Sequence, residues 1–270
     1  EQLLSSDLDL ALGGGQKHFA LLGEGSSKSL LAHARESGFE LLDSKAQLEK
    51  QYPNKKILGL FARNTLPVIL RGEGDRGAEA AVPSQSGVGL PKAMPCENNP
   101  KFADTPSLKL MTDAALAHLS GQSQTGFFLM VESASIDKQS HLRNACGSIG
   151  EVAQLNEALD SALLFAQTHP NTLIIVTADH GQAAQLIPGV SLYSTPDLPI
   201  YSPGKLFRIV TPEGAVMAVN YATNNFVSEE HTGVNVPLFS NAVGKNVIPT
   251  MLTQPELFNV MSRYLGLDRQ

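Results

Sequence analysis

Short apolar runs alternate with helical patterns along this chain, and two of these runs lead directly into acidic residues. Residues 127–131 and 173–178 are apolar and strand-sized, whereas residues 107–120 and 149–168 carry apolar side chains at helical spacing. Strands that alternate with helices predict an α/β fold with a largely parallel, open sheet sandwiched by helices. Ligands bind beyond the C-terminal ends of such strands, so polar residues there are candidate site residues.

The same pattern predicts further elements. We expect strands at 8–12, 57–62, 215–221 and 236–240, and helices at 28–37 and 255–265. Residues 71–99 and 189–204 are rich in Gly and Pro and are predicted to be irregular loops. With no repeat and no linker, one domain is the simplest organisation. The buried face of the long helix is expected to comprise Ile149, Val152, Leu155, Leu159, Ala162, Leu163 and Ala166.

Composition excludes several classes of protein. The chain has 270 residues, 42% of them hydrophobic, which argues against intrinsic disorder. Its net charge of -6 argues against a nucleic-acid partner, because such proteins present clustered positive charge to phosphates. No apolar run approaches the ~20 residues of a membrane helix, so no membrane partner is expected. The chain begins at Glu1 without a signal-peptide pattern, which fits either a mature N-terminus or a piece of a longer protein.

The residues after the two apolar runs suit a metal site. Glu132 follows the first run, and Asp137 and His141 lie four residues apart, on one face if that stretch is helical. Asp179 and His180 follow the second run. Zn²⁺ takes His nitrogen and carboxylate oxygen, and Mg²⁺ prefers oxygen. Each residue alone is more often a helix cap or a solvated loop residue, but their conjunction makes a metal site as good an interpretation as that one.

Three motifs resemble the metal-ligand segments of bacterial alkaline phosphatases. They are residues 127–141, Thr177-Ala178-Asp179-His180 and Glu230-His231-Thr232-Gly233, in the order and spacing of that family. The blocks at 12–15 and 106–113 match the same enzymes, and the resemblance covers essentially the whole chain. Ser133 departs from the pattern, which usually has Gly there, and it touches no ligand position.

The resemblance implies a site with two zinc ions and one magnesium ion. Asp137, His141 and His231 would bind the first zinc, Asp179 and His180 the second zinc, and Glu132 the magnesium, while Lys138 would help to hold phosphate. The implied reaction is hydrolysis of phosphate monoesters through a phosphoserine, in an enzyme that usually works as a homodimer. The other four histidines are expected to be solvated; they are His18, His33, His118 and His169.

The family's serine nucleophile has no counterpart in this chain. The expected block would lie N-terminal to everything here, so residues 1–270 resemble the C-terminal part of a single domain. Asp160-Ser161-Ala162 repeats the nucleophile's letters but falls inside a predicted helix, whereas an exposed nucleophile sits on a sharp turn. The segment 23–29 lacks the glycine that a Walker loop places before its lysine. We therefore expect the chain to be inactive alone, with its own N-terminal part as a possible separate partner.

The two cysteines are open to two interpretations from the residues alone. Cys96 and Cys146 fit either free buried thiols or a cross-link, and their wide spacing does not suit zinc. The resemblance implies a Cys96–Cys146 disulfide. A disulfide in turn implies an oxidising compartment, so a periplasmic or secreted protein is expected.

Two other functions remain as alternatives. Sulfatases, phosphodiesterases and cofactor-independent phosphoglycerate mutases share the metal-ligand logic, although their spacings differ. A non-catalytic metal-binding remnant is the second alternative, and the full set of C-terminal ligands argues against it. Comparing a sulfate ester with a phosphate monoester separates the first alternative from the phosphatase.

Overall fold

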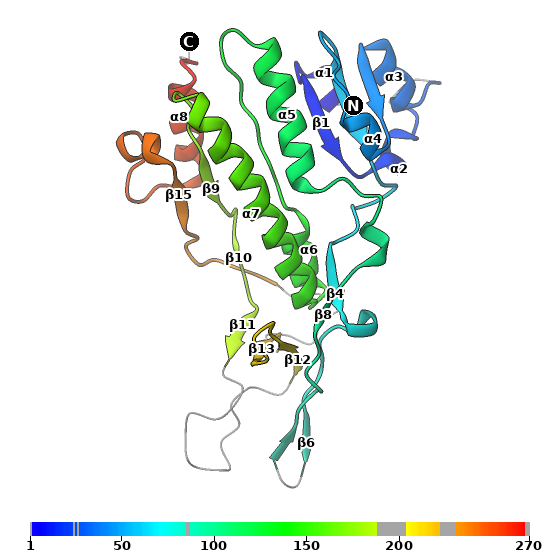
Figure 1. The fold of residues 1–270 in the computed structure, drawn as a ribbon, viewed down its shortest axis with the longest axis vertical. Helices are drawn as coiled ribbons and strands as arrows, with labels where there is room; N and C mark the ends of the chain where they lie inside the picture. The colour runs from blue at the N-terminus through cyan, green and yellow to red at the C-terminus, as the bar shows by residue number, and fades with distance from the viewer. Residues whose placement is uncertain are drawn as a thin grey trace.

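A parallel sheet of three strands forms one end of the molecule (Figure 1). The computed structural model describes residues 2–23, 25, 27–84, 87–187, 204–221 and 230–267. The sheet has the order β1-β3-β2, and both pairings are parallel. Its strands are β1 (Leu10–Gly13), β2 (Phe39–Leu42) and β3 (Lys56–Leu60). Side chains alternate between its faces, so each strand contributes to two separate cores.

Helices cover both faces of this sheet. On one face, Leu58 and Phe39 pack with residues of α1 (Gln2–Ser5), α2 (Gln16–Phe19) and α3 (Leu30–Glu36). On the other face, Ile57 and Leu42 pack with α4 (Lys45–Leu48) and with Met111 of α5 (Leu108–Gln122). Ser107 caps α5 by accepting a hydrogen bond from the Leu110 amide, at the predicted helix start. The predicted α/β fold with helices on both faces of a parallel sheet is confirmed.

The long helix buries a different face from the predicted one. It forms α7 (Ala145–Thr168), but none of the seven stripe residues is buried, and Val152 is 50% exposed. The buried face instead carries small and polar residues, because α5 and β4 (Leu70–Gly72) approach it closely. A Cβ on Gly150 would lie 2.8 Å from Ile69, so only glycine fits there. The buried residues are Ala145, Cys146, Gly147, Gly150, Glu151, Gln154, Ala158 and Ser161.

The remaining ladders of the described residues are antiparallel. The predicted loop at 71–99 contains short strands that pair with one another and with later strands, so that expectation is too simple. The strands at 39–42 and 205–210 are not predicted by the pattern, and the expected loop at 189–204 lies outside the described residues apart from Gly204. The ladders are β4 with β8 (Cys96–Asn98), β6 (Val82–Ser84) with β7 (Gly87–Gly89), and the order β11 (Gln185–Ile187), β13 (Val216–Asn220), β12 (Lys205–Val210), β5 (Glu79–Ala80).

Two more ladders and the C-terminal helix complete the fold. Strands near both predicted positions are present: β9 (Ile175–Thr177) pairs with β15 (Leu238–Ser240), although the pairing is antiparallel, and α8 (Gln254–Tyr264) follows. Strand β10 (Gly181–Gln182) pairs with β14 (His231–Thr232), and α6 (Ser135–His141) precedes α7. Single 3₁₀ turns lie at Glu73–Asp75, Pro100–Phe102 and Ala242–Asn246. Among the described helices, none has the length and apolarity that crossing a membrane requires.

A disulfide joins β8 to the first turn of α7. The Cys96 and Cys146 sulfurs are bonded, with their Cα atoms 5.4 Å apart. Cys146 is fully buried in a core with Met94, Phe207 and Tyr221. The implied cross-link is therefore present, and the alternative of free thiols is wrong.

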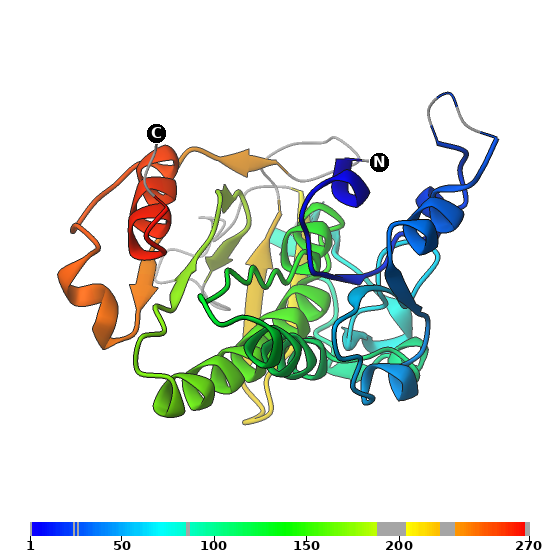
Figure 2. The ribbon, with the colours of Figure 1, turned by 90° about the horizontal axis from the view of Figure 1, so that it is seen from above.

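Residues 127–131 do not form the predicted buried strand. The segment is extended, but none of its backbone groups is hydrogen-bonded to another part of the described chain. Phe128 is 57% and Met130 73% exposed, while Phe127, Leu129 and Val131 are half-buried. The segment (green in Figure 2) passes between the β1–β3–β2 sheet and the β9–β15 pair. A strand needs a neighbour for its ladder, and none of the described strands adjoins this segment.

Candidate metal centre

Helix α6 places Asp137 and His141 on one face, as their spacing predicted. The His141 Nε2 atom lies 3.3 Å from Asp137 Oδ1. The helix is tied to α7 because the Ser148 hydroxyl of α7 donates to the Ile136 carbonyl at 3.0 Å. The carboxylate and imidazole groups are therefore held on a fixed short helix rather than on a free loop.

The β10–β14 ladder brings His231 to the same place, 90 residues farther along the chain. Its Nε2 atom lies 3.3 Å from Asp137 Oδ1 and 2.8 Å from His141 Nε2. One ligand atom from each of the three residues lies within 4.8 Å of the others. Two ligands bound ~2.0–2.1 Å from a shared tetrahedral ion are themselves about 3.3 Å apart. The three side chains thus have the chemistry and the spacing to hold one zinc ion.

His180 adjoins this cluster, and Asp179 lies at its margin. The His180 ring stacks on the His231 ring, with centroids 3.5 Å apart, and its Nε2 atom is 3.7 Å from Asp137 Oδ1. The Asp179 side chain is 84% exposed, and its Oδ2 atom is 3.6 Å from His180 Nε2. The structure therefore places these two residues beside the triad without closing a second ligand set.

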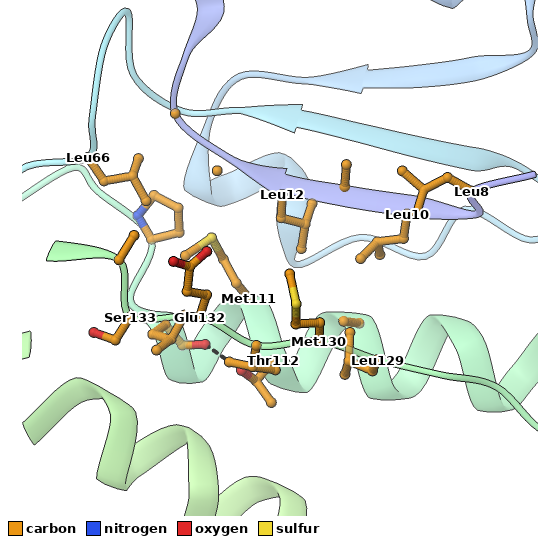
Figure 3. Close-up of a pocket in the computed structure, with 18 of the residues that line it drawn as sticks. Leu8, Leu10, Leu12, Leu66, Met111, Thr112, Leu129, Met130, Glu132 and Ser133 are labelled. Carbon is orange, nitrogen blue, oxygen red and sulfur yellow. Dashed lines mark hydrogen bonds between the residues drawn. The ribbon is translucent and has the colours of Figure 1, made fainter. Parts of the chain in front are cut away.

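Glu132 and Lys138 are not members of the triad, and both line an open groove of about 1250 Å³. The groove runs between β1 and residues 127–133, along α5, and Glu132 points into it (Figure 3). Leu10, Leu12 and Met130 form apolar walls. The Glu132 and Lys138 side chains are both exposed, and both residues line this groove.

Ser133 fits its position without backbone strain. Its φ angle is not positive, so the glycine usual in the resembling family is not required here. The Ser133 hydroxyl donates to the Glu151 carbonyl of α7 at 2.9 Å. Serine at this position therefore adds a hydrogen bond between the segment at 127–134 and α7.

Ser161 is not an exposed nucleophile. It is buried on α7, where its hydroxyl lies 3.5 Å from the Glu157 carbonyl and accepts from Lys109 Nζ at 3.0 Å. His18, His33 and His169 are exposed as expected. His118 is half-buried instead, and burial lowers the pKa of its imidazole, so the expectation of a solvated ring is wrong there.

Gln182 is a site residue that sequence reasoning missed. Its Nε2 atom donates a hydrogen bond to Asp137 Oδ1. An uncharged amide carries no signal of metal chemistry by itself. Its place two residues after His180 is the one indication that the sequence offers.

The comparisons with known proteins agree with this geometry. Residues 1–196 match the family model described as "Alkaline phosphatase". Alkaline phosphatase of Escherichia coli strain K12 is 38% identical over an alignment of 274 positions, which covers 99% of this chain and 54% of that protein. Streptomycin-6-phosphate phosphatase of Streptomyces griseus is 34% identical over 99% of this chain and 58% of its own length. The chain thus spans about half the length of these relatives.

Solved structures show the same fold. Alkaline phosphatase from the Antarctic bacterium TAB5 superposes with a TM-score of 0.66 at 21% identity, covering 99% of this chain and 63% of that chain. The Thermus thermophilus alkaline phosphatase gives a TM-score of 0.51 at 27% identity over 68% of this chain and 33% of that chain. The partial coverage agrees with the expectation that a further segment of the family's fold lies outside residues 1–270. The family model, the sequence relatives and the converging Asp–His–His triad together show that the chain belongs to the alkaline phosphatase family.

Proposed function

We propose that this chain carries the metal-binding part of an enzyme that hydrolyses phosphate monoesters at a site with two zinc ions and one magnesium ion. The convergence of Asp137, His141 and His231 on one point is the observation that carries the proposal. Asp179 and His180 supply the beginning of a second zinc site, and Glu132 supplies a carboxylate for magnesium. Bound metals would polarise the phosphoryl oxygens and lower the pKa of the attacking hydroxyl.

The chain's own residues would bind and orient the phosphate. The Lys138 ammonium is exposed on α6, one residue from Asp137, where it can attract the phosphate dianion. His180 stacks on His231, so the two imidazoles hold each other in place. The serine that forms the phosphoserine is proposed to come from outside this chain, since the Asp160-Ser161-Ala162 block lies within α7 and its serine is buried. We therefore propose that the chain alone does not turn over substrate.

We propose that the groove is filled by extended segments of the family's remaining part, within one domain. Two strand edges and one extended segment lie in this region. Within the described residues, β1 pairs only with β3, β9 pairs only with β15, and residues 127–131 pair with nothing. Unpaired edges and exposed apolar side chains are the surface that an added strand recognises. Strands placed there would reach Glu132. The magnesium site would then be complete only when the groove is filled, because the Glu132 carboxylate alone is one ligand of that site.

Compartment and assembly complete the proposal. The Cys96–Cys146 disulfide supports an oxidising location, periplasmic or secreted. A homodimer is proposed from the family resemblance alone, and sedimentation of the intact protein would test it.

Zinc titration of the metal-free chain followed by phosphate titration tests the main proposal. We expect zinc to bind, and inorganic phosphate to bind the zinc-loaded chain more tightly than the metal-free chain. Inorganic sulfate in place of phosphate is the control, because a sulfatase site would prefer it. Failure to bind zinc, or a preference for sulfate, would refute the proposal. Turnover of p-nitrophenyl phosphate by the chain alone would refute only the proposal that the nucleophile comes from outside this chain.

A further inference from the structure

The strand ladder that delivers His231 also places Gln182 beside Asp137. In the antiparallel pairing of β10 with β14, Gln182 lies directly opposite His231. The ladder continues one residue farther, since the Ala183 amide donates to the Glu230 carbonyl at 3.0 Å. Backbone hydrogen bonds therefore fix the position of Gln182 relative to one proposed zinc ligand.

The Gln182 side chain contacts a second proposed zinc ligand. Its Nε2 atom donates to Asp137 Oδ1, the same oxygen that lies 3.3 Å from His141 Nε2 and from His231 Nε2. An ionised carboxylate only accepts hydrogen bonds, so the amide must turn its NH₂ group toward Asp137. The Gln182 Oε1 atom is then buried, with no hydrogen-bond partner in the described part of the chain. The contact with Asp137 is thus what orients this amide.

We infer that Gln182 is a positioning residue for the metal site: it holds the Asp137 carboxylate in place for the ion. The inference rests on the proposed metal site and adds a residue to it. A carboxylate oxygen has two lone pairs, so it can accept one hydrogen bond and still bind a cation. The amide is uncharged, so the full negative charge of Asp137 remains available to the metal. A carboxylate on a short helix that also faces three imidazoles needs such a fixed donor to keep one orientation.

The test compares zinc affinities of the full chain, measured by competition with a chromogenic chelator. Gln182→Met removes the donor while keeping the side chain's length and volume. Partners that orient metal ligands typically contribute 10–100-fold in affinity, so we expect a loss of about that size. Gln185→Met is the matched control, because Gln185 is exposed on β11 and should leave the affinity within twofold. Gln182→Leu removes the donor with a different shape and should give the same loss.

A second readout separates positioning from simple destabilisation. With Co²⁺ as the probe, the visible absorption bands report the coordination geometry, and we expect them to change in Gln182→Met but not in Gln185→Met. The unfolding midpoint of the metal-free chain should stay the same. An affinity within twofold of wild type, or a loss of affinity with unchanged Co²⁺ bands, overturns the inference and leaves the metal site standing. If wild type and Asp137→Ala bind zinc equally, the proposed metal site itself is wrong and the inference falls with it.

Discussion

Removal of the Cys96–Cys146 disulfide should lower the free energy of unfolding by about 4 kcal/mol. The two cysteines are 50 residues apart in sequence. Closing a loop of that length removes about 14 cal/mol/K of entropy from the unfolded chain, which is ~4 kcal/mol at 25 °C. Domains are stable by only ~5–15 kcal/mol, so this cross-link is a large share of the total. Its removal acts mainly on the unfolded state, which becomes less compact.

Urea unfolding of the Cys96→Ala, Cys146→Ala double variant measures this contribution. The reduced wild-type chain is the control, because it lacks the cross-link but keeps both sulfur atoms. Cys146 is fully buried against Met94 and Phe207, so the double variant should be slightly less stable than the reduced chain. The slope of unfolding free energy against urea should also rise, since more surface becomes exposed on unfolding. A double variant within about 1 kcal/mol of the oxidised chain would contradict the loop-entropy argument.

Three further outcomes are expected. His231→Ala should weaken zinc binding more than about 100-fold, measured by chelator competition, whereas the exposed His33→Ala should not change it. Burial raises the pKa of the Glu151 carboxyl. The stability of the wild-type chain should therefore fall as the pH rises above the ordinary glutamate value of 4.5 and through the folded-state pKa. Glu151→Gln should flatten that decline, measured by urea unfolding across this pH range. Met130→Asp should abolish the ability of this chain to capture the part of the Escherichia coli relative that it does not match, expressed as a separate chain. Met251→Asp, at a residue that is equally exposed at 73%, should not. Equal capture by the two variants would refute the groove proposal.

Local signals predict α3, α5, α7, α8 and part of the site. The cap at Ser107 and the apolar spacing after it identify α5, and the four-residue interval between Asp137 and His141 suffices to place both on one face of α6. These features depend on neighbours in sequence, which a single chain displays directly. His231 has no such local signal, because its position depends on its pairing with Gln182 of β10, 49 residues earlier in the chain. Only the family resemblance identifies it.

The face that α7 buries could not be predicted from apolarity. The helix turns Gly147 and Gly150 toward its neighbours because those neighbours come too close for any larger side chain: a Cβ on Gly147 would lie 2.4 Å from the Gln139 amide oxygen. Gln154 is also buried there, and its amide is satisfied because it donates to Glu151 and accepts from the Leu108 amide. Close approach of the neighbouring elements and satisfied hydrogen bonds determine which face of α7 is buried, and neither produces a hydrophobic stripe in the sequence.

Two of the wrong expectations concern neighbouring surfaces, and that shared location is informative. Residues 127–131 and the stripe of α7 were both expected to be buried, and both are partly exposed, with Phe127 packed edge to face against Phe165 of α7. Apolar side chains at strand and helix spacing are typical of surfaces that another element covers. Patches of this kind on a folded chain mark interaction sites. The sequence pattern therefore supports the proposal that this surface is covered, with the groove beside β1 as the place where the covering strands would enter.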